Sequence, residues 1–528
     1  MSRLTSEAAA TAERLKRAGR RVVRYVAAVV IGLRNRLRSG GGRVPGLVSV
    51  VVPAHDVERY IGEALSSLRR QSYANLEIVV VEDGSTDGSG RVARRHRLRD
   101  PRVRVVSRPN GGPSAARNTG VAAARGEFLT FLDPDDLVAP DAYAKAIAAL
   151  RESGSDFAVL SYDRMEHGRR KRPGTWITAA HHTRRLRCTI EDAPEIQVNA
   201  VVWSKVFRRA FYDAAGLRFV EGMIYEDQPL SARAYARASA FDILPDVGVT
   251  WRIRDEMTSI TQQTTDAANL AAHNEAVRLS LAELQGAGRA AAATTRALQL
   301  LANNMRLFIR HADRADDAFW REIRIGLREL VDLVPPDEYL REVPAQEKVL
   351  HELILRDDRE RAATFVAGGG MELTRFATEL GPDGRYRARL PFIDDRQAAI
   401  PPSRFVLADR QLSLNSRVTA VRRNDRTHLV IDGWAYIRNV DLAARPPRIS
   451  VRAIGPDGMR VDLRTQQRHC EAPAAVGTHA HCDYRNGCFS AWLDTRAVDL
   501  ASGAWRFEVE LEVPGVTRSA LLALPTTA

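Results

Sequence analysis

The sequence predicts an α/β protein with a mainly parallel sheet, followed by a helical linker and a C-terminal β-sandwich. Three observations lead to this prediction. Apolar β-branched runs alternate with amphipathic segments over about 46–160, residues 266–370 are rich in Ala, Leu and Arg with helical periodicity, and short alternating runs separated by turn residues fill the remainder. Repeated strand–helix–strand units form a parallel sheet covered by helices.

A chain of 528 residues exceeds what one hydrophobic core usually organises, so we expect several parts. The glycines at 40–42 separate a basic arm from the first apolar strand, and those at 368–370 precede a change to strand-like patterning. The expected parts are an amphipathic arm at 1–45, an α/β domain at 46–265, a helical linker at 266–370 and a β-sandwich domain at 380–528.

Each element of the α/β domain follows from its local pattern. Buried runs bounded by turn residues predict the strands 48–52, 76–81, 103–106, 128–132 and 156–160. Apolar residues at helical spacing predict the helices 61–70, 89–99, 114–124 and 141–152. Further along we expect a helix at 228–238, strands at 241–244 and 247–253, and tail strands at 428–436, 448–454 and 505–513.

The positive charge is concentrated near the N-terminus. The formal net charge is +13, and residues 1–40 hold ten Lys or Arg against Glu7 and Glu13. The apolar run 22–33 is interrupted by Arg24 and is shorter than the roughly 20 residues of a spanning helix. Because no cleavage site follows it, we expect a cytoplasmic protein that is peripheral on the inner face of the plasma membrane. A disordered basic tail is the alternative.

Composition argues against two other classes of protein. The basic arm has little aromatic interleaving beyond Tyr25, so nucleic-acid binding is not expected. Four cysteines do not indicate a disulfide framework, and free thiols fit a reducing compartment. A zinc site in the tail is conceivable but matches no paired cysteine spacing, so loop and strand roles are the better interpretation of Cys470, His479, His481, Cys482 and Cys488.

Polar residues follow three of the predicted strands. The first strand ends in Pro53-Ala54-His55-Asp56, the second in the acidic segment 82–87, and the fourth in the aspartate cluster 133–136. Ligands of such sheets bind outside the carboxyl ends of the strands. Three carboxylates within four positions repel one another unless a cation or protons neutralise them, and a hard divalent cation, completed by diphosphate oxygens and water, would do so. An exposed acidic turn that caps the next helix is the alternative.

The stretch from about residue 48 to 150 resembles the nucleotide-sugar domain of the family 2 inverting glycosyltransferases, which have the GT-A fold. Four ordered motifs carry the resemblance: VVVP at 50–53, EDGSTD at 82–87, NGGPSAARNTG at 110–120 and FLDPDD at 131–136. The sequence differs at His55-Asp56, where many relatives have Tyr-Asn.

The resemblance implies roles for residues in these motifs. Pro53, Ala54 and Asp56 would lie around the nucleotide base, and Asp83 would hydrogen-bond it. Arg117 would lie near the nucleotide, and a surface position on its helix is the alternative. Asp133 and Asp135 would form the metal motif for Mg or Mn. Gly112 lies in a glycine-rich segment that permits close backbone approach to a diphosphate, beside a helix start that favours anions.

A catalytic base is predicted further along the chain. An inverting transferase needs a group on the acceptor side to take the hydroxyl proton. The acidic pair Glu226-Asp227 precedes a helix, and the resemblance gives the base role to Asp227, with Glu226 as its supporting neighbour. A capping carboxylate is the structural alternative.

The acceptor side shows a narrower resemblance, to the wall teichoic acid β-glycosyltransferase branch. It covers the segments 199–207 and 221–230 and the tail, together with the segment that holds Arg252 and Arg254, which would lie near the diphosphate and acceptor. The expected donor is a UDP-sugar, most simply UDP-N-acetylhexosamine, and the expected acceptor is a glycan or poly(polyol phosphate). The tail would bind polymer or form a homo-oligomer. Capsular or exopolysaccharide synthesis and a non-catalytic carbohydrate-binding scaffold are the alternatives.

Overall fold

The computed structural model describes residues 30, 43–254, 264–424, 427–473, 477, 479–496 and 505–524. It contains two compact units, Met1–Arg296 and Ala297–Ala528, each with its own dense network of contacts. The division falls inside helix α10 (Ala290–Gln299). The predicted four-part division remains a prediction, and its arm, 1–45, lies almost entirely outside the described residues.

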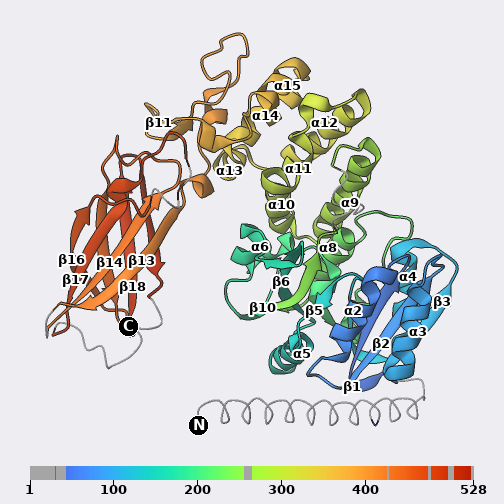
Figure 1. The fold of residues 1–528 in the computed structure, drawn as a ribbon. Helices are drawn as coiled ribbons and strands as arrows, with labels where there is room; N and C mark the ends of the chain where they lie inside the picture. Colours follow the sequence, from blue (N-terminus) through green and yellow to red (C-terminus); the bar gives the residue numbers. More distant parts are fainter. Residues whose placement is uncertain are drawn as a thin grey trace. The chain divides into compact units, whose positions relative to one another are not determined.

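The first unit is built on a ten-stranded sheet (Figure 1). The main path of the sheet has the order β3-β2-β1-β4-β9-β6-β10-β5, with β7 beside β6 and β8 beside β10. The strands are β1 (Val44–Ala54), β2 (Leu76–Asp83), β3 (Val103–Arg108), β4 (Gly126–Phe131), β5 (Leu137–Val138), β6 (Phe157–Glu166), β7 (Arg169–Lys171), β8 (Arg185–Cys188), β9 (Lys205–Arg208) and β10 (Phe241–Arg252). The longer pairings are parallel, as predicted.

Helices of the first unit cover this sheet or, later in the unit, pack against one another. They are α2 (Glu58–Arg69), α3 (Ser89–Arg99), α4 (Gly112–Ala123), α5 (Ala142–Ser153), α6 (Thr175–Ala180), α7 (Arg209–Ala214), α8 (Asp227–Arg237) and α9 (Ala267–Gly286), followed by α10. The helices and strands predicted up to residue 160 are all present, with ends shifted by a few residues. The two strands predicted at 241–244 and 247–253 are wrong as separate elements, because one strand, β10, continues through an irregularity between Leu244 and Val247.

The core of the first unit explains one glycine of the glycine-rich motif. Val50, Val51 and Val52 in β1 are fully buried, as expected of a strand covered on both faces. A Cβ atom at Gly120 would lie 2.3 Å from the side chain of Val51. Glycine at this position therefore lets α4 lie close to β1, which fixes the start of α4 relative to the strand ends.

The second unit joins a helical part to a β-rich part. Its helices are α11 (Arg306–Ile309), α12 (Asp317–Val331), α13 (Pro336–Glu342), α14 (Ala345–Leu355) and α15 (Arg359–Ala367). A hairpin of β11 (Thr378–Leu380) and β12 (Tyr386–Ala388) follows. The remaining strands form a seven-stranded antiparallel sheet: β13 (Leu414–Arg423), β14 (His428–Ile437), β15 (Arg448–Ile454), β16 (Arg460–Arg468), β17 (Cys488–Asp494), β18 (Arg506–Val513) and β19 (Val516–Leu522).

The seven-stranded sheet has the order β13-β14-β17-β16-β15-β18-β19. Its two outermost strands, β13 and β19, contact each other, so the sheet curls into a half-barrel around an apolar core. The predicted tail strands correspond to β14, β15 and β18. The structure thus has a curled antiparallel sheet in the place where the sequence predicted a β-sandwich.

The expectation that the cysteines are free is wrong for one pair. Cys470 and Cys488 form a disulfide across the ends of β16 and β17, with Cα atoms 6.1 Å apart. Cys188 and Cys482 are free thiols. Among the described residues, no group of three or more His, Cys, Asp or Glu side chains is arranged to hold an ion.

No helix within the described segments combines the length and the apolar character needed to cross a bilayer. The apolar run 22–33 lies, apart from Val30, outside the described residues.

Candidate active site

Three neighbouring parallel strands bring the predicted site residues to one edge of the sheet. β1 lies between β2 and β4, so the residues that follow these strands share an edge. Pro53 and Ala54 are the buried last residues of β1, and Ala54 lies opposite Glu82. His55 and Asp56 follow them and are exposed. The edge thus collects the side chains that the strand pattern predicted there.

The exposed turn after β1 is tied to the loop after β2. Asp56 has a positive φ of 47°, a conformation that Asp tolerates better than most residues. Its carboxylate accepts a hydrogen bond from the Thr86 amide at 2.8 Å. This bond lowers the pKa of Asp56, so the carboxylate stays ionised and holds the two loops together.

Asp83 organises the glycine-rich segment. Its buried carboxylate accepts hydrogen bonds from the amides of Gly111, at 3.2 Å, and Gly112, at 2.8 Å, and pairs with Arg108 at 3.2 Å. The ring of His55 contacts the Asp83 carbonyl oxygen at 2.9 Å. Gly112 has a φ of 83°, which favours glycine, and its added Cβ would meet open space. In this structure Asp83 therefore fixes the start of α4.

Arg117 connects the acidic groups of two distant segments. It lies on α4, is 4% exposed, and donates from one nitrogen to Asp133 at 2.7 Å. Another nitrogen donates to Glu226 and lies 3.8 Å from Asp227. Burial opposes the charge of Arg117, but the three carboxylates outweigh burial and raise its pKa. The structure therefore contradicts the alternative that Arg117 is a surface residue of its helix.

The aspartate cluster after β4 divides into three environments. Asp133 faces Arg117, Asp135 accepts from Arg254 at 2.6 Å, and Asp136 is buried and accepts from the Arg252 amide at 2.8 Å. Burial raises the pKa of Asp135, and the charge of Arg254 opposes this rise. Burial also raises the pKa of Asp136 well above its usual value, and the neighbouring carboxylates of Asp135 and Asp133 add to the rise.

Asp133 and Asp135 are suited to bind a divalent cation whose coordination shell is completed by other ligands. Their side chains are 28% and 15% exposed, and one carboxylate oxygen of each is paired with an arginine. The described residues hold no site of three or more His, Cys, Asp or Glu ligands. One or two carboxylates, with phosphate oxygens and water, are what magnesium commonly uses. The residues thus suit a cation that arrives with a diphosphate.

Asp227, the first residue of α8, has the properties of a proton acceptor. One carboxylate oxygen accepts from the Val202 amide at 3.2 Å, and the other is buried without a hydrogen bond in the described structure. Burial raises the pKa of Asp227 to about 7, with Arg117 opposing and Glu226 adding to the rise. A general base works best when its pKa lies near the working pH, so this value suits the role.

Two supporting features were not predicted from the sequence. Tyr225, just before the acidic pair, has a φ of 63°, a strained conformation for a bulky residue. Its hydroxyl hydrogen-bonds Asn269 at 3.3 Å, and its ring meets the ring of His273 edge-on at 5.4 Å. Helix α9 therefore helps to hold the acidic pair in place.

Lys205 is the second of these features. Its ammonium group is fully buried and donates to the carbonyl oxygens of Asn199 and Val201, both at 2.8 Å. Burial lowers its pKa to about 7, while Asp227 opposes that shift. The segment that Lys205 holds leads directly to Val202, whose amide donates to Asp227. Motif resemblance indicated this segment, but the contact itself requires the fold.

The arrangement can therefore perform two tasks at one edge of the sheet. Asp133 and Asp135, with Arg254 beside them, can hold a cation and an anionic leaving group. Asp227 can take a proton, and Arg117 links the two groups. The predicted residues Arg252 and Arg254 lie against the aspartate cluster, because the Arg252 side chain donates to the Asp135 carbonyl at 2.9 Å.

Comparison with protein families and curated proteins agrees with this geometry. Residues 49–212 match the family model described as glycosyl transferase family 2. The uncharacterized glycosyltransferase EpsJ of Bacillus subtilis (strain 168) is 32% identical over 219 residues, which cover 41% of this chain and 63% of EpsJ. The succinoglycan biosynthesis protein ExoO of Rhizobium meliloti (strain 1021) is 32% identical over 217 residues, which cover 39% and 61%. The chain thus covers less than two thirds of either relative.

Solved structures show the same fold. The crystal structure of S. aureus TarS matches with a TM-score of 0.53 and 18% identity, covering 90% of this chain and 77% of TarS. S. aureus TarS 1-349 in complex with UDP-GlcNAc matches with a TM-score of 0.52 and 23% identity, covering 65% and 96%.

Proposed function

Because the chain belongs to the family 2 glycosyltransferases, which have the GT-A fold, we propose that it transfers a sugar from a UDP-sugar to a hydroxyl group of a cell-envelope polymer, with inversion. The observation that carries this proposal is the link through Arg117 between Asp133 and the pair Glu226-Asp227. A direct displacement needs a group that stabilises the leaving diphosphate and a group that accepts the hydroxyl proton. Here one guanidinium holds the candidates for both roles together.

In the proposed reaction the acceptor hydroxyl oxygen attacks the anomeric carbon of the donor. A new carbon–oxygen bond forms while the bond from that carbon to the diphosphate breaks, and the diphosphate keeps the electron pair. Asp227 takes the hydroxyl proton. Arg117 keeps its charge beside Asp227 throughout and stabilises the ionised form of the base before the proton arrives.

Asp133 and Asp135 would hold Mg or Mn, which would neutralise charge on the departing diphosphate. Arg254, whose side chain is 27% exposed beside Asp135, would add a fixed positive charge at the same place. The base then acts where the new bond forms, whereas the cation motif and Arg254 act where the bond to the diphosphate breaks, so variants of the two groups should fail in different ways.

We propose UDP-N-acetylhexosamine as the donor and a poly(polyol phosphate), such as teichoic acid, as the acceptor. The fold likeness to TarS 1-349, solved with UDP-GlcNAc, supports the donor class. The segment 199–207 and the tail support the acceptor class through their resemblance to the wall teichoic acid branch, and a net charge of +13 suits an anionic polymer.

Exopolysaccharide assembly is the second candidate, and the identity to the succinoglycan biosynthesis protein ExoO favours it. A non-catalytic carbohydrate-binding scaffold is a weaker candidate, because a scaffold gives no reason for a buried carboxylate with a pKa of about 7.

For the location we propose the cytoplasmic face of the plasma membrane. The ten basic residues within 1–40 would bind anionic lipid there, close to lipid-linked polymer.

Donor hydrolysis and transfer across a panel of nucleotide sugars test the proposed function. We expect release of UDP from one UDP-sugar and faster release when a polyol phosphate oligomer is added. A neutral exopolysaccharide fragment added in its place separates the two candidate acceptors. Absence of UDP release with every donor, from a protein that is folded and supplied with Mg and Mn, would contradict the proposal.

A further inference from the structure

The half-barrel of the second unit carries a basic face with a half-buried aromatic ring, that of Trp492. Cross-strand register places Arg422 opposite Val430, Val430 opposite Trp492, and Trp492 opposite Arg464, in one row across four strands. Side chains directly opposite in an antiparallel sheet point to the same face. We call this surface the Arg–Trp face, made by β13, β14, β17 and β16.

A second set of side chains belongs to the same face. Asp432 on β14 accepts hydrogen bonds from Arg422 and Arg468, each at 2.9 Å, and from Ser490 at 2.5 Å. Two arginines therefore share one carboxylate, and the side chains of both arginines are about half exposed. The Asp432 cluster carries one net positive charge, and it fixes the arginines in position.

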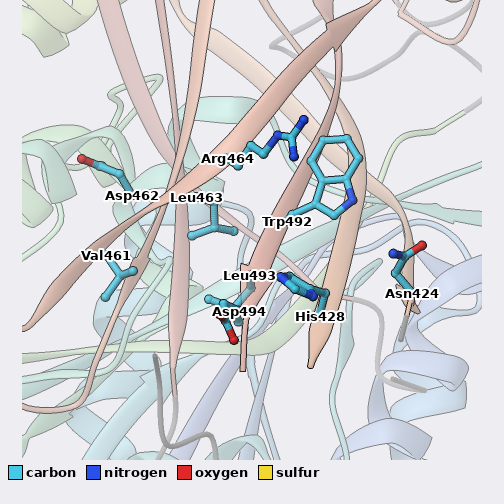
Figure 2. Close-up of a pocket in the computed structure, with 9 residues that line it drawn as sticks. All are labelled: Asn424, His428, Val461, Asp462, Leu463, Arg464, Trp492, Leu493 and Asp494. Carbon is cyan, nitrogen blue, oxygen red and sulfur yellow. The ribbon is translucent and has the colours of Figure 1, made fainter. Parts of the chain in front are cut away.

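A hollow at one end of this face is lined by side chains that can hydrogen-bond (Figure 2). It has a volume of about 420 Å³ and opens beside the Trp492 ring. Hydrogen-bonding side chains from three strands and one turn surround it: Asn424, His428, Asp462, Arg464 and Asp494. Leu463 and Leu493 also line it.

One guanidinium in the hollow can bind an anionic group of a ligand. Asp494 is paired with Arg496 at 2.8 Å, and Asp462 is paired at 2.8 Å with Arg452, which also contacts Glu508 at 3.4 Å. Arg464 lies 5.8 Å from the centre of the Trp492 ring, and no carboxylate partner for it is found among the described residues. Its guanidinium is therefore the available cation of the hollow, and guanidinium groups suit phosphate.

We propose that this hollow binds a repeat unit of a phosphate-containing glycan or polyol polymer. A sugar or polyol carbon chain lies against the negative face of the Trp492 ring, its hydroxyl groups donate to Asp494 and Asp462, and its phosphate pairs with Arg464. Arg468, four positions along β16 and about 13 Å away, meets a neighbouring phosphate. The inference rests on the proposed function for its choice of polymer, but it adds a retention site separate from the reacting groups.

The volume of the hollow suits a small ligand such as one repeat unit of the polymer. Ligand sites commonly have volumes of about 300 to 1,000 Å³, and this one lies near the lower end of that range. A single weak site of this kind gains strength when the same polymer also occupies the transferase site, because linked binding raises the effective concentration. Retention of long acceptors over short ones is therefore the expected benefit.

The test is a binding titration of the full chain, without donor or metal. The probe is a synthetic oligo(polyol phosphate) of about eight repeats, compared with a neutral oligosaccharide and a single-stranded oligonucleotide of equal charge. The variants are Trp492→Ala, Arg464→Gln and Arg464→Lys. The matched control is Arg506→Gln, an exposed arginine on β18, three strands away from β17.

We expect Trp492→Ala and Arg464→Gln each to weaken binding of the polyol phosphate by on the order of tenfold or more, Arg464→Lys to weaken it less, and Arg506→Gln to leave it unchanged. Hydrolysis of the donor should remain at the wild-type rate in all four. Wild-type affinity in both Trp492→Ala and Arg464→Gln, or equal affinity of the wild type for the oligonucleotide, would overturn the inference. Failure of the proposed function would instead appear as absent donor hydrolysis in the wild type.

Discussion

The guanidinium of Arg117 donates to the carboxylate of Asp133 across 2.7 Å, on a helix and a strand end that are 16 positions apart. The same side chain reaches Glu226, 109 positions further along the chain. Arg117 therefore links two acidic segments that lie far apart in the sequence.

Arg117→Lys tests whether this link depends on shape or only on charge. A lysine keeps the positive charge but cannot donate to two carboxylates in the fork geometry of a guanidinium. We expect the variant to stay folded and to lose transfer by on the order of 100-fold or more, since both acidic groups lose their fixed positions. Turnover within a few-fold of wild type would show that charge alone suffices.

Asp227→Asn should remove the base without removing the donor site. We expect donor affinity measured by calorimetry to be almost unchanged and transfer to fall by on the order of 10² to 10⁴. Glu226→Gln, which retains Asp227, serves as the matched comparison and should be less severe. Asn is a good helix cap, so a purely capping Asp227 would show little change in activity.

The same variant should be more stable than wild type at neutral pH. Asp227 has a pKa of about 7 in the folded protein against 3.8 for the free side chain. Between about pH 4 and 7 the unfolded chain has ionised while the folded protein still binds the proton, so wild-type stability falls as pH rises. Asn cannot ionise, so the advantage of Asp227→Asn grows through this range, to on the order of a few kcal/mol, and then stays constant.

Thermal unfolding at about pH 4, 6 and 8 measures this effect, with Glu226→Gln as a control for general loss of charge. Turnover of the wild type should meanwhile rise with pH through about 7, because only the ionised carboxylate accepts a proton. A stability difference that does not change with pH would contradict the raised pKa.

Removing the cation, or a residue of the cation motif, should affect transfer in a third way. A chelator should abolish transfer, and added Mg or Mn should restore it, because Asp133 and Asp135 are suited to share a cation with the diphosphate. Asp135→Asn should resist rescue by the same ion and should also weaken donor binding, unlike Asp227→Asn. Full activity in the presence of chelator would reduce the cluster to a structural turn.

The N-terminal arm has its own test, which does not depend on the described fold. Removing residues 1–42 should release the protein from anionic vesicles and leave turnover on a soluble acceptor nearly unchanged. Flotation of the shortened protein with anionic vesicles to the same extent as the full chain would contradict the anchoring role.

The elements and site edge of the first unit could be predicted because their signals are local. Strand runs such as 48–52 and the motif at 110–120 carry their own patterns, and parallel strands bring their carboxyl ends together by topology. The support of Asp227 could not be predicted in this way. Tyr225 and Asn269 are 44 positions apart, and their hydrogen bond exists only once α9 lies beside α8.

Other differences have equally physical reasons. The break expected after Leu244 is a shift of register within β10, because Pro245 interrupts the pattern without ending the strand. Cys470 and Cys488 follow no spacing rule, because their pairing depends on the alignment of β16 with β17, which places residue 468 opposite residue 488.

The contact between β13 and β19 has a consequence for how copies of this chain could assemble. An open sheet edge offers a row of backbone groups onto which another chain can add a strand. Here the two outermost strands shield each other, so strand addition has little edge to use. Association of the second unit with another copy must then proceed through side chains on its faces and loops. Such association is selective, because side chains discriminate between partners and backbone groups do not.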